Sequence, residues 1–218
     1  MAFGGIFIVP KIVRLLDTYQ QLENRLRVVQ RSGEELSATF GRLESIANST
    51  RSSLKGTVEL YARLALATKE MALQQSTLLQ VTKSVNQAIV VSGASAKEAE
   101  NGLIQLSQGL AAGALRGDEL RSVLEQLPRV ADVISKRLGV TRGELRKLGE
   151  AGALSSGLII DAFIQDQNAL EQEFAKTQET VGQSVVLLQN ALIGLTESSA
   201  STALVLETVR ITLKAITV

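Results

Sequence analysis

Apolar residues in the first third of the chain recur in alternating steps of four and three positions from Leu15 to Met71. This spacing keeps them on one face of a helix, as in a helix that packs lengthwise against a partner. If unbroken, such a helix would be about 85 Å long. We take the following positions on the stripe as a self-association seam: Leu15, Tyr19, Leu22, Leu26, Leu36, Phe40, Leu43, Leu54, Tyr61 and Leu64.

Two signals predict that this stripe is interrupted. Ser32 and Glu35 have the spacing of a capping box beside Gly33, which indicates a helix stop followed by a new start. Residues 48–53 (NSTRSS) have low helix propensity, because short polar side chains compete for backbone hydrogen bonds. The stripe is therefore compatible with an intermolecular coiled coil, or with two or three helices of one phase that fold on each other.

In the middle of the chain, helix start and stop signals lie closer together, which predicts a compact group of short helices. Ser95 with Glu98, and Thr141 with Glu144, have capping-box spacing, while Pro128 and Gly139 interrupt the helical pattern between them. These signals place helices over residues 96–111, from 117 to about 127, over about 130–138, from 142, and from a cap at Ser155 or Ser156 to Gln165.

Beyond residue 170 the turn signals become sparse. Apolar residues at steps of three, four or seven predict one long helix over residues 170–195 and another from about residue 202. The predicted fold is all-α, with long amphipathic helices flanking a compact bundle of short helices and a coiled coil as one arrangement of the long ones. We divide the chain into an N-terminal amphipathic helix (1–35), a helical domain (36–168) and C-terminal long helices (169–218).

The amino-acid composition limits the kinds of metal-binding and catalytic site that the chain can form. The chain has no cysteine, no histidine and a net charge of +1. Thiolate and imidazole metal sites, redox chemistry and the usual general base near neutral pH are therefore missing. We predict no catalytic, cofactor-binding or metal-binding residues and no enzyme activity. We also expect no membrane span, because the apolar N-terminal run is too short and the apolar C-terminal stretch is interrupted by Glu207, Arg210 and Lys214.

Residues 131–150 (ADVISKRLGVTRGELRKLGE) have the pattern of a helix-turn-helix with Gly139 at the turn. On the exposed face of its second helix, Arg142, Arg146 and Lys147 could contact bases and phosphates. A helix-turn-helix regulator is thus the alternative function. The same pattern also arises from any two short helices joined by a glycine turn, and we do not expect nucleic acid as a partner.

The amino-acid sequence of two long segments resembles that of a known protein family. Phe40–Thr68 (FGRLESIANSTRSSLKGTVELYARLALAT) and Ser84–Val140, with LSQGLAAGALRGDELRSVLEQLP inside it, resemble the N-terminal conserved domain of tail tape measure proteins of long-tailed bacteriophages and prophages. The similarity covers roughly residues 40–195, and its longest matching stretch is specific to this family.

This resemblance implies a structural virion protein that governs tail length and tube assembly and assists genome ejection. It implies further copies of the chain, tail tube and tail tip proteins, assembly chaperones and the host membrane as partners. The expected location is the tail lumen or tail tip, and the host cytoplasm during assembly. Family members are usually several times longer, whereas 218 residues of unbroken helix would reach about 330 Å. We therefore expect a fragment or a short member, and no length control by this piece alone.

Overall fold

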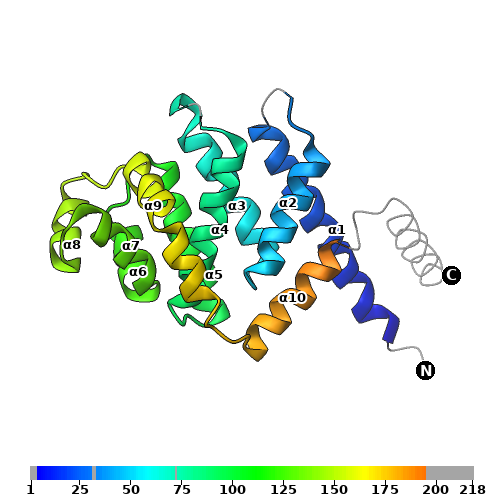
Figure 1. Ribbon diagram of the computed structural model, residues 1–218. Coiled ribbons are helices and arrows are strands. Elements are labelled where there is room, and N and C mark those ends of the chain that lie inside the picture. The colour runs from blue at the N-terminus through cyan, green and yellow to red at the C-terminus, as the bar shows by residue number, and fades with distance from the viewer. Residues whose placement is uncertain (1–3, 31–32, 72, 195–218) are drawn as a thin grey trace.

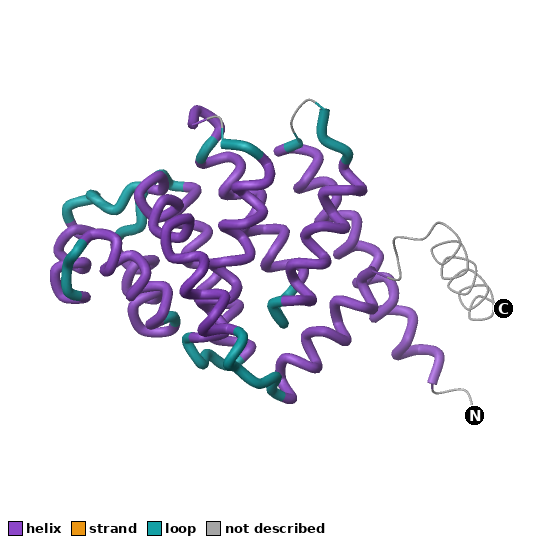
Figure 2. The backbone as a smooth tube through the Cα atoms, in the orientation of Figure 1, coloured by secondary structure: helices purple, strands orange, loops and turns teal. Residues whose placement is uncertain are grey.

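The structure is a computed structural model that describes residues 4–30, 33–71 and 73–194, with side chains from residue 14 onward except that of Leu15. The described part contains ten α-helices, one short 3-10 helix and no β-strand (Figures 1 and 2). The all-α prediction is confirmed. The helices are α1 (Gly4–Val29), α2 (Leu36–Ser49), α3 (Leu54–Ala67), α4 (Gln75–Val91), α5 (Ala96–Ala111), α6 (Gly117–Gln126), α7 (Pro128–Leu138), α8 (Arg142–Glu150), α9 (Ser156–Phe174) and α10 (Val181–Gly194), with η1 (Lys69–Met71) between α3 and α4.

The N-terminal stripe is divided among α1, α2 and α3, which agrees with the predicted interruptions and excludes one unbroken helix over residues 15–71. The predicted break at residues 48–53 is confirmed. The chain leaves α2 at Ser49, turns through Arg51 at φ 53°, and starts α3 where the Ser53 hydroxyl accepts from the backbone N–H of Gly56 at 3.3 Å. A further break at η1, ahead of α4, was not predicted. The chain is also interrupted between Val29 and Leu36, as predicted, but the capping box of Ser32 and Glu35 is wrong, because Glu35 is itself the N-cap of α2 and its side chain makes no cap hydrogen bond. Ser32 lies outside the described residues.

The centre of the body is formed by α3, α4, α5 and α9, and α4 runs along α9 while α3 packs on α5 (Figure 1). Their buried apolar side chains are mainly aliphatic, in keeping with the low aromatic content of the chain. Each contributes about 1.5–3 kcal/mol through its removal from water. The largest buried side chains of this centre include Leu54, Leu60, Leu64, Leu78, Leu106 and Phe163.

The short helices α6, α7 and α8 form one end of the body (Figure 1). The capping boxes of α5 (Ser95–Glu98) and α8 (Thr141–Glu144) are both present, and Gly139 ends α7 in the left-handed region at φ 65°, all as predicted. Of the two candidate caps for α9, Ser155 occupies the N-cap. These local signals were sufficient because each acts within one turn of its helix.

Two C-terminal boundaries differ from prediction. α9 continues past Gln165 to Phe174, and the predicted helix over residues 170–195 is instead the end of α9, a loop and the separate helix α10. The new start has its own cap, since the Thr180 hydroxyl accepts from the Gln183 N–H at 3.2 Å while Thr180 N–H donates to Gln183 Oε1 at 3.1 Å. The helix predicted from residue 202 lies outside the described residues.

α10 turns back across the body and packs against α1, α2 and α5, while α1 packs on α3 (Figure 1). The predicted boundary at residue 169 falls inside α9, and the division into three parts stays a prediction. None of the described helices is both long enough and apolar enough to cross a membrane.

Candidate interaction site

The self-association seam predicted from the sequence falls in the core of the chain itself. Tyr19 and Leu36 are half-buried against the core, and Tyr19 stacks at a tilt on Phe40 with the ring centroids 5.0 Å apart. The other described seam residues are at most 3% exposed, namely Leu22, Leu26, Phe40, Leu43, Leu54, Tyr61 and Leu64. Leu15 belongs to the side chains that are not described. The stripe therefore serves packing of α1, α2 and α3 within one chain, which was the second arrangement that the pattern allowed.

The predicted helix-turn-helix residues form two helices, α7 and α8, joined at Gly139. Arg142 is held within the chain, because its guanidinium pairs with Asp132 at 2.7 Å and donates to the carbonyl of Pro128 at 3.3 Å. Arg146 and Lys147 lie exposed on α8. The pair that fixes Arg142 joins α7 to α8, so this arginine acts as a support for the turn. Nucleic-acid contact by these three residues stays an untested prediction.

The strongest charge cluster links α7 to α9. Arg129 binds Asp166 at 2.6 Å and Glu173 at 2.5 Å, and Lys136 also pairs with Asp166, whose side chain is nearly buried. Burial acts to lower the pKa of Arg129, but its hydrogen bonds to Glu173 and Asp166 outweigh this and raise it. Each charge has a partner of opposite sign, so the cluster fastens two helices and offers no free acid or base. Within the described residues there is also no group of acidic side chains that could hold a metal ion.

α10 is fastened to the turn between α2 and α3 by one buried amide. Asn190 accepts from the backbone N–H of Leu54 at 2.8 Å and donates to the carbonyl of Ser52 at 2.8 Å and to Asn48 Oδ1 at 3.1 Å. Leu54 is the first residue of α3, so Asn190 satisfies one of the N–H groups that a helix leaves open at its start. This contact joins residues more than 130 positions apart.

The loop between α9 and α10 is fastened to the same turn. The guanidinium of Arg51 lies 4.4 Å from the centroid of the Phe174 ring and donates to the hydroxyl and, at 3.5 Å, to the carbonyl of Thr177. These contacts hold Arg51 in the left-handed backbone region, which is costly for a residue with a side chain. The turn of residues 49–53 therefore holds both the loop after α9 and, through Asn190, helix α10.

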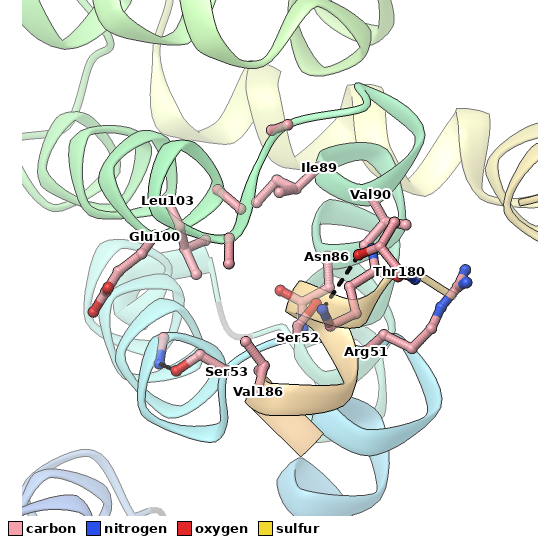
Figure 3. Close-up of a pocket in the computed structure, with 15 residues that line it drawn as sticks. Arg51, Ser52, Ser53, Asn86, Ile89, Val90, Glu100, Leu103, Thr180 and Val186 are labelled. Carbon is pink, nitrogen blue, oxygen red and sulfur yellow. Dashed lines mark hydrogen bonds between the residues drawn. The ribbon is translucent and has the colours of Figure 1, made fainter. Parts of the chain in front are cut away.

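A small, mainly apolar pocket lies under the start of α10 between α3, α4 and α5 (Figure 3). Several of its polar side chains already serve helix starts, Ser53 for α3 and Thr180 with Gln183 for α10. Asn86 donates to Thr57 at 2.9 Å, but its Oδ1 has no hydrogen-bond partner among the described residues. Asn86 Oδ1 is thus the one buried polar side-chain atom of the described lining that lacks a hydrogen-bond partner, and the exposed Glu100 carboxylate also lines the pocket.

The outer face of α10 carries the most regular exposed apolar pattern of the described part. Val181, Val185, Leu188 and Leu192 follow one another in steps of four, three and four and are 84%, 50%, 61% and 40% exposed. We call these four residues the α10 stripe. Helix α10 contains no charged residue. The opposite face is the one that carries Asn190 and the buried Ile193, so α10 is apolar on both sides.

Comparison with protein families gives one match, to the family described as tape measure protein, over residues 10–200. The match spans most of the chain and includes all ten helices except the first residues of α1. The chain belongs to the tape measure protein family. It matches no curated protein and no solved structure.

Membership of the tape measure family gives the chain a structural role in a phage tail and a place among tail proteins. The features described above fit a role in protein contact, since the charged clusters are internally paired and the exposed apolar residues are concentrated on one helix. Sequence reasoning missed Asn190 and the partners of Arg129, because their contacts join distant segments. The spacing of Thr180 and Gln183 did carry a capping-box signal for the start of α10.

Proposed function

We propose that this chain acts as a folded docking domain of a tail tape measure protein, situated in the tail lumen or at the tail tip. In this role the protein governs tail length and tube assembly and takes part in genome ejection. Its partners are tail tube and tail tip proteins, assembly chaperones in the host cytoplasm, further copies of the chain and, during ejection, the host membrane. The family match over residues 10–200 carries this proposal.

The path of the chain supports docking over measuring. Residues 4–194 as one continuous helix would extend about 290 Å, whereas a globular domain of that length has a radius of gyration of about 16 Å. Here α4 runs along α9, and α10 returns to α1 and α2. A molecular ruler measures by its extended length, so a segment that doubles back on itself contributes an attachment point and adds little to the measured distance.

An insertion distinguishes the two roles in the phage that encodes the chain. We would insert 28 residues of helical sequence between Gln178 and Glu179, which are exposed in the loop before α10. A docking domain should leave the tail length in electron micrographs unchanged. If this part of the chain spans the tube as a ruler, each tail should lengthen by about 42 Å. Circular dichroism of the purified variant provides the folding control.

A second arm tests the tail role itself. Interrupting the gene with an early stop codon should abolish normal tails, and supply of the intact protein from a plasmid should restore them. Tails of unchanged number and length in the interrupted phage would refute the tape measure function. Tails that lengthen in the insertion variant would refute only the docking role of this domain.

A further inference from the structure

The pocket under the start of α10 contains a buried amide whose oxygen is unpaired. Asn86 is fully buried, and its Nδ2 donates to Thr57 Oγ1 at 2.9 Å and to Thr50 Oγ1 at 3.3 Å. Each threonine hydroxyl has one hydrogen, which it donates to the carbonyl of Ser53 at 2.9 Å or of Ile46 at 2.7 Å. The hydroxyls can therefore only accept from Asn86, and this fixes the orientation of the amide. Its Oδ1 is left with no partner among the described residues.

This unpaired oxygen faces the pocket. The amide nitrogen points toward Thr50 and Thr57, which do not line the pocket, whereas Asn86 does. The oxygen is therefore the part of the amide that meets the cavity, whose walls include the apolar side chains of Ile89 and Leu103 (Figure 3). A buried acceptor without a donor costs free energy, which a donor from outside the fold would recover.

Water is a poor match for this pocket. A buried water molecule usually makes about three hydrogen bonds. Other polar side chains of the described lining are already engaged, since the Ser52 hydroxyl donates to a carbonyl and Thr180 and Gln183 bind each other, while Glu100 is exposed at the mouth. Water at Asn86 Oδ1 would otherwise face apolar walls, so an apolar group with one donor should displace it favourably.

Among amino-acid side chains, this requirement selects tryptophan. The indole is neutral and apolar, and its N–H is a donor with no acceptor beside it. Hydroxyl and amide side chains, and the peptide group itself, also carry acceptors, which would lose water in the pocket without gaining a donor. Lysine and arginine would bring in a charge for which the buried part of the pocket provides no opposite charge.

The size of the pocket and the composition of the chain indicate where the indole comes from. The cavity volume is about 60 Å³. A cavity of about 150 Å³ encloses a whole benzene ring, so this pocket takes the N–H edge of an indole and leaves the rest at its open mouth. The sequence contains no tryptophan, so a second copy of these 218 residues cannot supply it. The partner must be a different protein.

We propose that this pocket receives a tryptophan side chain of another tail protein, whose indole N–H donates to Asn86 Oδ1. Thr180, Gln183 and Val186 at the start of α10 also line the pocket, so the same contact would hold α10 against the body. The inference deepens the proposed docking function, on which it rests for the source of the tryptophan. The preference of the pocket for an N–H donor does not depend on that function.

The first test compares two probes on the purified full-length chain. Indole and benzofuran have the same shape, but benzofuran has an acceptor oxygen in place of the N–H donor. Binding would be followed through the methyl resonances of Ile89, Leu103 and Val186, which line the pocket. The variant Asn86→Leu removes the acceptor, and Gln126→Leu is the matched control. Gln126 lies on α6 outside this pocket and also has a buried, unpaired amide oxygen.

We expect benzofuran to bind about tenfold more weakly than indole in the wild type and in Gln126→Leu, because it cannot donate to the buried acceptor. In Asn86→Leu the two probes should bind equally. Indole that leaves these methyl resonances unchanged up to its solubility limit would overturn the inference, as would equal binding of both probes by the wild type. If Asn86→Leu loses helix content in circular dichroism, the wild-type comparison decides alone.

The second test identifies the natural occupant in assembled tails of the phage that encodes the chain. p-Benzoylphenylalanine in place of Ala96, which is exposed at the mouth, should cross-link to a tryptophan-containing segment of a different tail protein. The same residue in place of Gln108, exposed on α5 outside the pocket, should not. Cross-links only to copies of this chain, or only to segments without tryptophan, would overturn the assigned partner. Neither test bears on the stop-codon assay, so failure of this inference and failure of the tape measure function can be told apart.

Discussion

Replacing Asn190 by alanine should release α10 from the body while the remaining helices stay folded. Asn190 is 2% exposed and provides all the hydrogen bonds described between α10 and the turn of residues 48–54. Besides Asn190, only Ile193 of α10 is buried. The docking of α10 therefore depends on few groups, so the loss of the Asn190 amide should destabilise the docking of this helix more than the rest of the fold.

The cost can be estimated from the three partners of the amide. The N–H of Leu54 is buried and would lose its acceptor, which costs about 1–3 kcal/mol. The carbonyl of Ser52 is half-buried and would regain water in part, so we assign it about 1 kcal/mol or less. Asn48 is exposed and would regain water in full. The sum is about 1–4 kcal/mol, a large loss for a helix with only two buried residues.

Hydrogen exchange measured segment by segment is the appropriate assay. Amides of α10 should exchange about 5- to 700-fold faster in Asn190→Ala, because each 1.4 kcal/mol corresponds to a factor of ten, while those of α4 and α9 should change little. Gln189→Ala is the matched control, since Gln189 is the exposed neighbour of Asn190 on the same helix. Equal protection of α10 in the variant and the wild type would refute the assignment of Asn190 as its fastening.

Three further predictions concern the rest of the body. Asp166→Asn should lower the free energy of unfolding in urea by about 2–4 kcal/mol, because it leaves a partly buried arginine with one carboxylate fewer, whereas Asp161→Asn at an exposed pair should change it by less than about 1 kcal/mol. Gly109→Ala should destabilise by about 1–3 kcal/mol, since a Cβ there would lie 2.6 Å from Leu115 Cδ1 and 3.2 Å from its Cα; Gly41→Ala on α2, which meets no atom within 4 Å, should stabilise by up to about 1 kcal/mol, and equal effects in thermal melts would contradict the close approach. The backbone N–H and hydroxyl of Thr141 bind the Glu144 carboxylate and lower its pKa below the ordinary 4.5, so the stability it adds should be complete above pH 4.5 and lost as the pH falls through the lowered value; a difference between wild type and Glu144→Gln that persists at the lowest pH would contradict this.

The short helices of the middle segment could be placed from the sequence because their signals are local. Ser95 with Glu98, and Thr141 with Glu144, satisfy open N–H groups within one turn, and Gly139 provides the left-handed residue that ends α7. The bounds predicted for α5, residues 96–111, are those observed. Such contacts form among neighbours in the chain, so no knowledge of the tertiary structure is needed to predict them.

The boundaries of the long helices were harder to predict, because the regular spacing of apolar residues does not show where one helix ends and the next begins. Helices α1, α2 and α3 share one phase across two turns, and the phase alone suggested one rod. The break between α2 and α3 does have local signals, namely the low helix propensity of residues 48–53 and the Ser53 cap, whereas the break at η1 ahead of α4 was not predicted. The contacts that hold α10 in place join residues far apart in the sequence, for example the Asn190 amide and the backbone N–H of Leu54. No local sequence pattern predicts a contact between residues at that distance along the chain.

α10 shows most clearly why the choice between core and interface needs the fold. Its residues are apolar on two faces, and in the sequence the seam of Val181 and Leu188 looks like that of Leu22 and Leu26 in α1. The structure separates them, because α1 turns its seam into the body while α10 uses Asn190 and Ile193 for docking and leaves its seam in solvent. A buried amide on the inner face makes the orientation of α10 specific, since rotating the helix to bury the stripe would leave the N–H of Leu54 without an acceptor. The same hydrogen bond that fastens α10 therefore also determines which of its apolar faces remains available to a partner.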